Sequence, residues 1–500
     1  MHIFCSDKFK HSSPGTTLYG HLRNDDAYIL YDEEDTERIY LSGAEPLCKV
    51  VRYRKDRQRP LQCILRNGEL YFPDHTVEFF NPVGNTFSRT SGLVESETLT
   101  KKSVGFYGTG PLATAVANTL IRSGLGNVIF FGPASDAVDR LILASPIVEV
   151  SYTDSPDSLL GCDVLLITET PTFLIPPTIP VVYASVSCVS TRVHSDYPSA
   201  NTVNYYDISN AASYAARMAL DLLHKDIEDY IITTLDKRHT IRFRPDVSNS
   251  NSIYKHICIV GCGSVGSELS YALANAGVKQ LTLIDDDRLE IHNISRHVLT
   301  LRDLGRYKVD AMKELLETTI PGVIINAFPY ALQDIDYDGL DADLFICTAD
   351  SEVANAELND IARSKNRPFL SCLVFERCFG NVYFWDAGHT NHGTYYEYFY
   401  EKVDAETVRV HQQMYLSRNS TISTVIPGLH APILGAASLG ARYALDILKT
   451  GGLLNPDNDF TNQAIIKVNY TNRLLTGNAD LSMCRPGDVF YPNWKPQKGG

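Results

Sequence analysis

The sequence contains no Cys-x-x-Cys pair, although eleven of its 500 residues are cysteine. Closely spaced cysteine pairs make up four-cysteine zinc sites, and small secreted proteins use cysteines as a disulfide framework. Runs of about 18 uninterrupted apolar residues are missing as well, and the N-terminal residues lack the apolar core of a signal peptide. We therefore expect a cytoplasmic protein with no structural zinc and no membrane partner.

Positive charge is also scarce. The chain has 45 Lys and Arg residues against 59 Asp and Glu residues, which gives a formal net charge of −14. Nonspecific nucleic-acid binding depends on an excess of positive charge that neutralises phosphates, so we expect no nucleic-acid partner. The hydrophobic content of 44% is ordinary for a globular chain. This length suggests roughly two to four domains.

A pattern of strand, glycine-rich turn and helix occurs twice in the chain. In each copy a β-branched strand follows the helix, a buried strand led by Asp comes later, and an alanine-rich helix closes the unit. The turns lie at 108–110 and 261–263, the next strands at 127–131 and 280–284, the later strands at 163–167 and 343–347, and the closing helices at 211–223 and 431–448. Strands that alternate with helices predict parallel sheets, and the repetition indicates a diverged internal duplication.

We therefore predict an α/β fold with two Rossmann-like domains in tandem. A β-rich N-terminal domain precedes them, because Asn67-Gly68 between two short apolar runs is typical of a hairpin. The predicted boundaries are 1–85 for the β-rich domain, 86–225 for the first copy, 226–252 for a Ser/Asn-rich linker, and 253–500 for the second copy with a crossover segment at 387–427.

The first copy has lost polar residues that the second copy keeps. Ala113 stands at the third glycine position of its turn, and Gly132 stands at the position that Asp285 has in the second copy. Thr170 likewise stands where the second copy has Asp350. We expect the first copy to be a structural scaffold and the second copy to carry the chemistry.

The second copy has the pattern of a nucleotide site. Gly261, Gly263 and Gly266 allow a tight turn, in which backbone amides can approach a phosphate at a helix N-terminus. Asp285 comes at the end of the next strand, where a carboxylate suits a ribose hydroxyl, and Asp287 strengthens the nucleotide pattern. These residues alone leave an NAD-binding oxidoreductase open as an alternative.

Three further residues, which follow Asp287 in the chain, favour a nucleotide whose phosphates take part in the reaction. Arg296 can hold phosphate oxygens in a bidentate fork, and Lys308 adds a compact positive charge. Asn293 lies shortly before them and adds an amide. The alternatives are that the two cations are surface charges and that Asn293 caps a turn.

A further carboxylate follows the predicted strand at 343–347. Asp350 comes just past this strand, and open α/β sheets bind ligands at the carboxyl ends of strands. Beside a triphosphate, Asp350 would hold Mg²⁺, which takes few protein oxygens and keeps several waters. The alternative is that Asp350 caps the helix that follows, because Asp is frequent at helix N-caps.

In order and spacing, these residues resemble the adenylation domain of ThiF-type and ubiquitin-activating enzymes. The family pattern is Gly-x-Gly-x-x-Gly, Asp-x-Asp, Asn-x-x-Arg, Lys, and an Asp after the fourth strand, and it covers about 254–450 of this chain. The resemblance implies that ATP, with Mg²⁺, adenylates the C-terminal carboxylate of a ubiquitin-like protein. A conjugating-enzyme-like partner would then receive the acyl group, in a bacterial-type pathway, and the first copy would be the inactive half of the enzyme.

The resemblance also implies a role for Arg89. In the family a Tyr-Ser-Arg-Gln motif at this place sends its Arg across the interface to the ATP phosphates of the partner half. This chain has Phe87-Ser88-Arg89-Thr90 there, with Thr in place of Gln. Arg89 would therefore serve the site of the second copy.

The chain departs from the family at the acyl acceptor. Ubiquitin-activating enzymes often carry a catalytic Cys before the last helix, but residues 387–427 contain no cysteine. One alternative is that the enzyme stops at the acyl-adenylate. Another is an oxyester on Ser420 or Ser423, with His430 as a candidate base for the weakly nucleophilic hydroxyl.

Cys372 and Cys378 are a third alternative for the acceptor, although both lie in a predicted core strand. The substrate has alternatives as well, because relatives in the family activate sulfur-carrier proteins or ribosomal peptides. Outside the family, the alternatives are an NAD-binding oxidoreductase and a non-catalytic scaffold.

Overall fold

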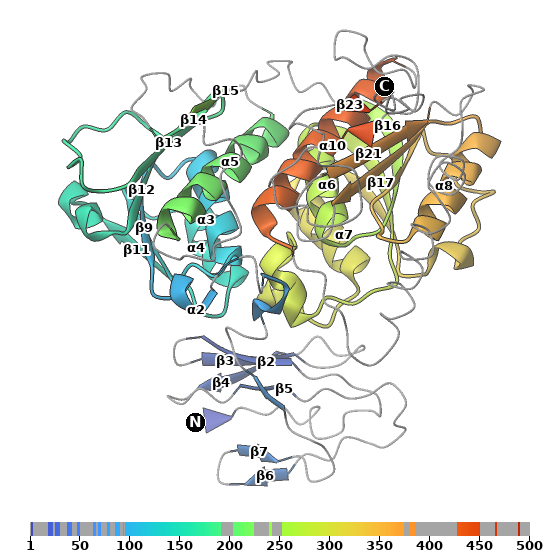
Figure 1. Cartoon of the computed structure of the whole chain (residues 1–500). Coiled ribbons are helices and arrows are strands. Elements are labelled where there is room, and N and C mark those ends of the chain that lie inside the picture. Colours follow the sequence, from blue (N-terminus) through green and yellow to red (C-terminus); the bar gives the residue numbers. More distant parts are fainter. Residues whose placement is uncertain are drawn as a thin grey trace, which may run out of the picture.

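The computed structural model of the chain describes most of its central part (Figure 1). The continuous stretches are 96–191, 204–224, 253–374 and 428–450. Outside them the structure describes short segments, which are mainly single strands. The structural statements that follow concern these described residues.

The first sheet has seven strands and a parallel core. The strands are β9 (Ser103–Tyr107), β10 (Asn127–Phe131), β11 (Glu149–Thr153), β12 (Val164–Ile167), β13 (Val181–Ser185), β14 (Cys188–Ser190) and β15 (Thr240–Arg242). Their order is β11-β10-β9-β12-β13-β14-β15, in which β14 runs antiparallel to both of its neighbours. Strand β12 is buried along its whole length, as expected for a parallel strand that is covered on both faces.

The second sheet has six strands. They are β16 (Ile253–Val260), β17 (Val278–Ile284), β18 (Ile324–Phe328), β19 (Leu344–Cys347), β20 (Phe369–Val374) and β21 (Asn381–Asp386). The order is β18-β17-β16-β19-β20-β21, and all neighbours are parallel except the pair β20 and β21. The chain therefore has the predicted α/β fold with Rossmann-like parallel sheets.

The two sheets share their topology. In both, the first five strands lie in the order third, second, first, fourth, fifth, which is typical of doubly wound nucleotide-binding sheets. Both sheets also anchor the Asp before the fourth strand in the same way. Asp163 accepts hydrogen bonds from the backbone amide of Ser103 and from the ammonium of Lys102. Asp343 accepts them from the backbone amide of His256 and from the ammonium of Lys255. This agreement supports the predicted duplication.

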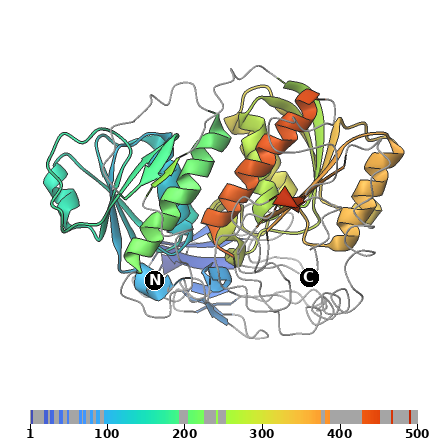
Figure 2. The same ribbon diagram turned by 45° about the horizontal axis from the view of Figure 1, so that its top comes forward.

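Helices fill the space between the two sheets, where α5 and α10 lie side by side (Figure 2). The main ones are α3 (Pro111–Arg122), α5 (Tyr205–Leu223), α6 (Ser264–Asn275) and α10 (His430–Thr450). Helix α10 packs against α5 and α6, and α3 packs against α5. We call the first sheet with α3 and α5 the first lobe, and the second sheet with its helices the second lobe.

The remaining helices are shorter or lie elsewhere on the sheets. Helix α7 (Lys308–Thr319) packs against β18, and α8 (Glu352–Ser364) packs against β19 and β20. The others are α2 (Ser96–Leu99), α4 (Asp136–Asp139), and the 3-10 helices η2 (Ser88–Thr90), η3 (Arg140–Ala144), η4 (Pro156–Gly161), η7 (Ile291–Arg296), η8 (Leu301–Asp303) and η9 (Leu332–Asp334).

Helix α10 contributes to the apolar cores of both lobes. Ala431 and Leu434 belong to the buried cluster of the first lobe, whereas Ile433 and Ala437 belong to that of the second lobe. The two cores are therefore in contact through one helix. None of the described helices is both long enough and apolar enough to cross a membrane.

Short strands are described near both ends of the chain. They are β1 (His2–Ile3), β2 (Tyr19–Arg23), β3 (Asp26–Leu30), β4 (Arg38–Ser42), β5 (Cys48–Val50), β6 (Ile64–Arg66), β7 (Glu69–Tyr71), β8 (Glu78–Phe80), β22 (Ile466–Lys467) and β23 (Val489–Phe490). The predicted hairpin at Asn67-Gly68 is confirmed, because β6 and β7 pair antiparallel around these two residues. A β-rich domain over 1–85 stays a prediction.

One strand lies where the sequence predicted a linker. Strand β15 falls inside residues 226–252, yet it pairs with β14 at the edge of the first sheet. Its alternating sequence, Thr240-Ile241-Arg242, suits an edge strand with one covered face. These three residues are therefore part of the first sheet and not of a flexible connection.

Candidate active site

The glycine-rich turn of the second lobe joins β16 to α6. Gly261 has φ +91°, and a Cβ there would lie 2.6 Å from the backbone nitrogen of Ala349. A Cβ on Gly266 would overlap the Gly261 carbonyl oxygen, whereas a Cβ on Gly263 would meet no atom within 4 Å. Two glycines are therefore required by backbone contacts, and the third borders open space at the start of a helix, where an anion can approach backbone amides.

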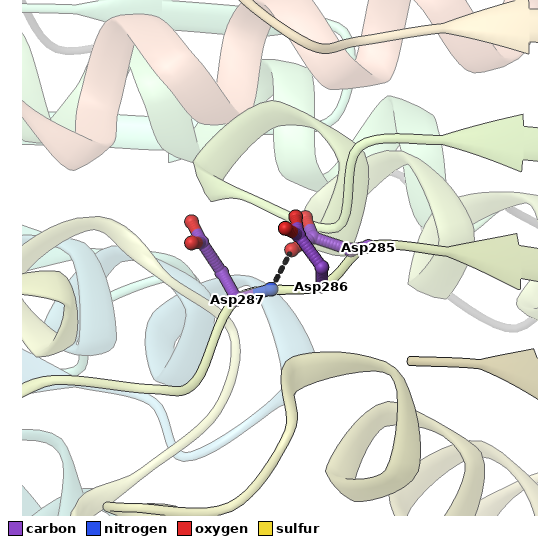
Figure 3. Close-up of side chains that lie close together, drawn as sticks. All are labelled: Asp285, Asp286 and Asp287. Carbon is purple, nitrogen blue, oxygen red and sulfur yellow. Dashed lines mark hydrogen bonds between the residues drawn. The ribbon is translucent and has the colours of Figure 1, made fainter. Parts of the chain in front are cut away.

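Asp285 holds this turn from the next strand. Its carboxylate accepts hydrogen bonds from the backbone amides of Cys262 and Asp287, the second at 2.8 Å (Figure 3). Burial raises the pKa of Asp285, although the ammonium of Lys308 counteracts it. The ribose contact of Asp285 stays a prediction, whereas the structure shows that its carboxylate orients the turn.

His297 holds the same turn from the other side, and the sequence analysis missed it. Its Nε2 lies 2.8 Å from the Cys262 carbonyl oxygen, and its Nδ1 accepts a hydrogen bond from the Leu299 amide at 3.1 Å. Burial and the nearby cations, Lys308 first among them, lower the pKa of His297 well below 6.5. The ring is therefore neutral, with its proton on Nε2 and donated to Cys262. Only its place next to Arg296 hinted at this role.

Thr348 completes the support of the turn. Its hydroxyl donates a hydrogen bond of 2.6 Å to the Gly261 carbonyl. Together with Asp285 and His297 it fixes the backbone of Gly261 and Cys262. The direction of the peptide groups in the turn is thus set before any ligand binds.

Lys308 is the first residue of α7, and it lies beside the turn. Its ammonium is 2.6 Å from the carboxylate of Asp287, and its side chain is 7% exposed against 69% for Asp287. Burial works to lower the pKa of Lys308, but the carboxylates of Asp285 and Asp287 outweigh it and the pKa is raised. Lys308 is therefore a buried positive charge at the site and not a surface charge.

Asn293 and Arg296 lie on η7. The Asn293 side chain accepts a hydrogen bond from the Glu290 backbone amide at 2.9 Å, so the turn-capping alternative for Asn293 is confirmed. Arg296 is the last residue of η7 and is half-buried. Its contact with a phosphate stays a prediction.

Asp350 lies at the carboxyl end of the second sheet and is exposed. The N-cap of α8 is Ser351, whose hydroxyl accepts a hydrogen bond from the Ala354 amide at 3.2 Å. The alternative that Asp350 caps this helix is therefore wrong. The reason is local, because the helix begins one residue later than that alternative requires.

The sheet order brings most of the predicted residues to one edge. Strand β16 lies between β17 and β19, so the turn, Asp285 and Asp350 follow three adjacent strands. Asp285, Asp286 and Asp287 also cluster, with one carboxylate oxygen of each within 4.8 Å of the others. A cluster of carboxylates is by itself no metal site, and Asp350 stays the predicted Mg²⁺ ligand.

The segment that carries Arg89 lies against the second lobe. The 3-10 helix η2 (Ser88–Thr90) packs against η7, on which Asn293 and Arg296 lie. The side chain of Arg89 lies outside the described residues. Its role at the second lobe's site therefore stays a prediction, which the position of its backbone favours.

The candidates for an acyl acceptor differ in their positions. Cys372 is fully buried on β20, with its sulfur 3.8 Å from the Ala436 carbonyl oxygen, which suits core packing and not acyl transfer. The predicted sites at Ser420, Ser423 and Cys378 lie outside the described residues. His430 is buried, with Nε2 2.8 Å from Glu268. Its two ring nitrogens contact Glu268 and Thr119, which suits a structural role.

Residues 228–476 match the ThiF family. The chain carries a ThiF family domain. This domain includes the second sheet, the glycine turn and α10. Of the predicted site residues, only Arg89 lies outside it.

Three curated relatives match parts of this chain. The ATP-dependent ubiquitin transferase-like protein Cap2 of Pseudomonas aeruginosa is 40% identical over 91 residues, 17% of each chain. The tRNA threonylcarbamoyladenosine dehydratase of Haemophilus influenzae is 38% identical over 72 residues, 14% of this chain and 28% of that protein. The adenylyltransferase and sulfurtransferase UBA4 of Scheffersomyces stipitis is 30% identical over 109 residues, 21% and 25% of the two chains. This chain therefore spans less than a third of each of these relatives.

Solved structures of E. coli MccB are also similar to this chain. One, at 20% identity, covers 53% of this chain and 68% of that chain with a TM-score of 0.33. The structure of MccB with ATP has a TM-score of 0.34. A likeness of this size supports no statement about function.

Proposed function

We propose that the second lobe adenylates a carboxylate with ATP. The observation that carries the proposal is the glycine turn, which borders open space at Gly263 while Asp285, His297 and Thr348 hold its backbone. Backbone amides at such a helix start suit the phosphates of a nucleotide. The ThiF family domain supports adenylation, whereas an NAD-dependent oxidoreductase gives Lys308 no role beyond its ion pair with Asp287.

The residues present fit ATP and Mg²⁺. A Cβ at Gly263 would enter the open space that a phosphate would take in this proposal, which would account for glycine at this position. Asp350, exposed at the same sheet edge, would hold Mg²⁺, and the metal would offset phosphate charge when bound. Arg296, Lys308 and Arg89 would supply the protein's own positive charge.

The proposed chemistry needs little covalent help from side chains. A carboxylate oxygen of the substrate attacks the α-phosphorus of ATP, the bond to the bridging oxygen of the β-phosphate breaks, and diphosphate leaves with the electron pair. The products are an acyl-adenylate and diphosphate. The protein positions the reacting groups and stabilises charge on the phosphates, and each such contact is typically worth about 10²–10³ in rate.

The substrate that we propose is the C-terminal carboxylate of a ubiquitin-like protein, with later transfer to a conjugating-enzyme-like partner. Relatives named as a ubiquitin transferase-like protein and as a ubiquitin-like modifier-activating enzyme support this substrate class. A sulfur-carrier protein is the second candidate, because another relative is named as an adenylyltransferase and sulfurtransferase. A ribosomal peptide is a third. The dehydratase relative acts on tRNA by its name, but a net charge of −14 does not favour a nucleic-acid substrate here.

We also propose the tandem arrangement that the sequence predicted. The first lobe would be an inactive adenylation-like half, and the two lobes would together replace a homodimer. The shared strand order and the matching Asp–Lys anchors support this interpretation. The first lobe has Pro111 at the start of α3, so it lacks one of the backbone amides that would bind a phosphate.

Exchange of labelled diphosphate into ATP tests the proposal. The protein is incubated with ATP, Mg²⁺, labelled diphosphate and, in separate samples, ubiquitin-like proteins, sulfur-carrier proteins and short peptides. Label should enter ATP only with a substrate whose carboxylate fits. Asp350→Asn should reduce exchange by about 10²–10³. Asp360→Asn, which changes an exposed carboxylate within α8, should not. Binding of NAD with no exchange for any substrate would overturn the proposal.

A further inference from the structure

Arg122 is a buried arginine of the first lobe whose side chain contacts the second lobe. It is the last residue of α3 and is 2% exposed. One terminal nitrogen donates to the Ile294 carbonyl, and the other donates to the carbonyls of Val298 and Leu299 at 3.2 and 3.3 Å. Its Nε donates to Asn118 of its own helix at 3.1 Å. The guanidinium therefore joins one helix of the first lobe to a short backbone segment of the second.

That segment contains two residues of the candidate site. Arg296 and His297 lie between Ile294 and Val298 in the chain, so the guanidinium holds the backbone on both sides of them. His297 in turn donates to the Cys262 carbonyl in the glycine turn. A continuous set of hydrogen bonds thus runs from α3 to the turn at which the phosphates would bind.

The second lobe has no equivalent of this contact at the matching helix position. Both α3 and α6 follow a glycine turn and have 12 residues, and α6 ends at Asn275 where α3 ends at Arg122. The Asn275 side chain donates to the Tyr271 carbonyl of its own helix. The asymmetry follows the expected division of roles, in which the first lobe supports the site of the second.

An arginine at this place is costly to bury, and its hydrogen bonds must offset the cost. Burial lowers the pKa of Arg122 to about 10, with Glu268 acting against it, so the group is charged at neutral pH. A buried cation carries a desolvation cost of several kcal/mol that its partners must offset. An apolar side chain would fill the same space without this cost, but it would leave three carbonyl groups without these donors.

The geometry points to Arg122 as a positioning residue that sets Arg296, His297 and the glycine turn for nucleotide binding. The first lobe would therefore contribute to the chemistry of the second through the backbone of residues 294–299. This inference rests on the proposed function for its nucleotide. The contact itself is independent of which substrate is adenylated.

Hydrogen exchange without ligand tests the contact, using the full chain and three variants. Arg122→Met removes every donor, Arg122→Lys keeps the charge with a different reach, and Arg217→Met removes a similarly buried arginine from α5 of the same lobe. Amides of 291–299 and 261–267 should exchange at least about tenfold faster in Arg122→Met than in the unchanged protein. The exchange rates in Arg122→Lys should lie between those of Arg122→Met and of the unchanged protein. Arg217→Met should leave the exchange rates of both segments unchanged.

The affinity for ATP with Mg²⁺, measured by calorimetry, gives the second readout. We expect Arg122→Met to weaken binding about tenfold and Arg122→Lys to recover part of the loss, with Arg217→Met close to the unchanged protein. Unchanged exchange at 261–267 in the Lys and Met variants would overturn the inference. If Arg122→Met does not fold, the exchange rates of Arg122→Lys are compared with those of Arg217→Met. Faster exchange at 261–267 in Arg122→Lys alone then supports the positioning role of Arg122, and equal rates overturn it. If the unchanged protein binds no ATP, the proposed function fails, but the exchange result still decides the role of Arg122.

Discussion

Cys262 shows at the scale of one residue how the turn is prepared for a ligand. Its amide is bonded to Asp285 and its carbonyl to His297, so both sides of the residue are fixed. Neither contact involves the Cys262 side chain, which is buried. A fixed array of peptide groups need not reorganise when charge develops on a phosphate, and this is the main physical advantage of a prepared site.

The glycines of the turn allow a matched pair of substitutions. Gly266→Ala puts a Cβ onto the Gly261 carbonyl oxygen, so it should lower the free energy of unfolding by about 1–3 kcal/mol. Gly263→Ala meets no atom within 4 Å and has φ −74°, so it should leave stability nearly unchanged while weakening ATP binding. Denaturant titration and calorimetry measure the two effects. Normal ATP affinity in Gly263→Ala would contradict a phosphate at this position.

His297 predicts a dependence of stability on pH. Its pKa is lowered in the folded protein, so below pH 6.5 the unfolded chain binds a proton that the folded chain does not. Stability should therefore fall as pH decreases below 6.5, and from about pH 7.5 to about pH 5.5 the contribution of His297 is about 1.4 kcal/mol. His297→Gln, which cannot titrate, should show a smaller fall by about this amount. An equal fall in both proteins would mean that His297 is not held neutral.

At the scale of elements, the candidate site lies on the loops after β16, β17 and β19. The helices α6 and α8 that follow such loops differ in how their N-termini are capped. Helix α6 begins without a side-chain cap, which keeps its first amides available, whereas α8 begins with the hydroxyl of Ser351. Asp350, one residue earlier, is then not needed for the helix. Adjacent residues thus serve stability and chemistry separately.

This separation predicts opposite effects for neighbouring substitutions. Ser351→Ala removes the cap of α8 and should lower the free energy of unfolding by about 1 kcal/mol. Asp350→Asn should change stability by less than about 0.5 kcal/mol but should suppress diphosphate exchange. Thermal unfolding and exchange assays on both variants check the pair. A stability loss in Asp350→Asn with normal exchange would reverse the assignment.

The sequence predicted the elements better than the contacts between them. Repeating strand and helix patterns were enough for β10, β12, β17 and β19, because periodicity and β-branched residues are local properties. The sequence could not determine where α8 begins, because Asp350 and Ser351 are both good N-cap residues. The sequence pointed to the site candidates that belong to a motif, and their roles stay predictions, whereas it gave no sign of the contacts of His297 and Arg122. Arg122 contacts residues more than 170 positions away, and only the packing of the two lobes brings them together.

At the scale of the whole molecule, three helices meet in a buried polar network between the lobes. His430 of α10 lies 2.8 Å from Glu268 of α6, and its other nitrogen lies 3.2 Å from the Thr119 hydroxyl of α3. The Thr119 hydroxyl also lies 2.8 Å from the Ala115 carbonyl oxygen of its own helix. The network therefore joins the first lobe, the second lobe and the helix that enters both cores.

A double-mutant cycle tests whether this network links the lobes. Glu268→Leu or His430→Leu alone leaves one buried polar partner without the other, and each should lower the free energy of unfolding by about 3–5 kcal/mol. The double variant should lose clearly less than the sum, because two apolar side chains can pack without a desolvation cost.

Urea unfolding, followed separately by probes in each lobe, measures the cycle and the cooperativity together. If the network links the lobes, each single substitution should destabilise both lobes in parallel, because Thr119 and Glu268 belong to different lobes and His430 bonds to both. A single variant that unfolds only the second lobe at lower urea would show that the apolar contacts of α10 suffice. An additive double variant would show that Glu268 and His430 act independently, and it would remove the basis for treating the buried pair as a connection between the halves.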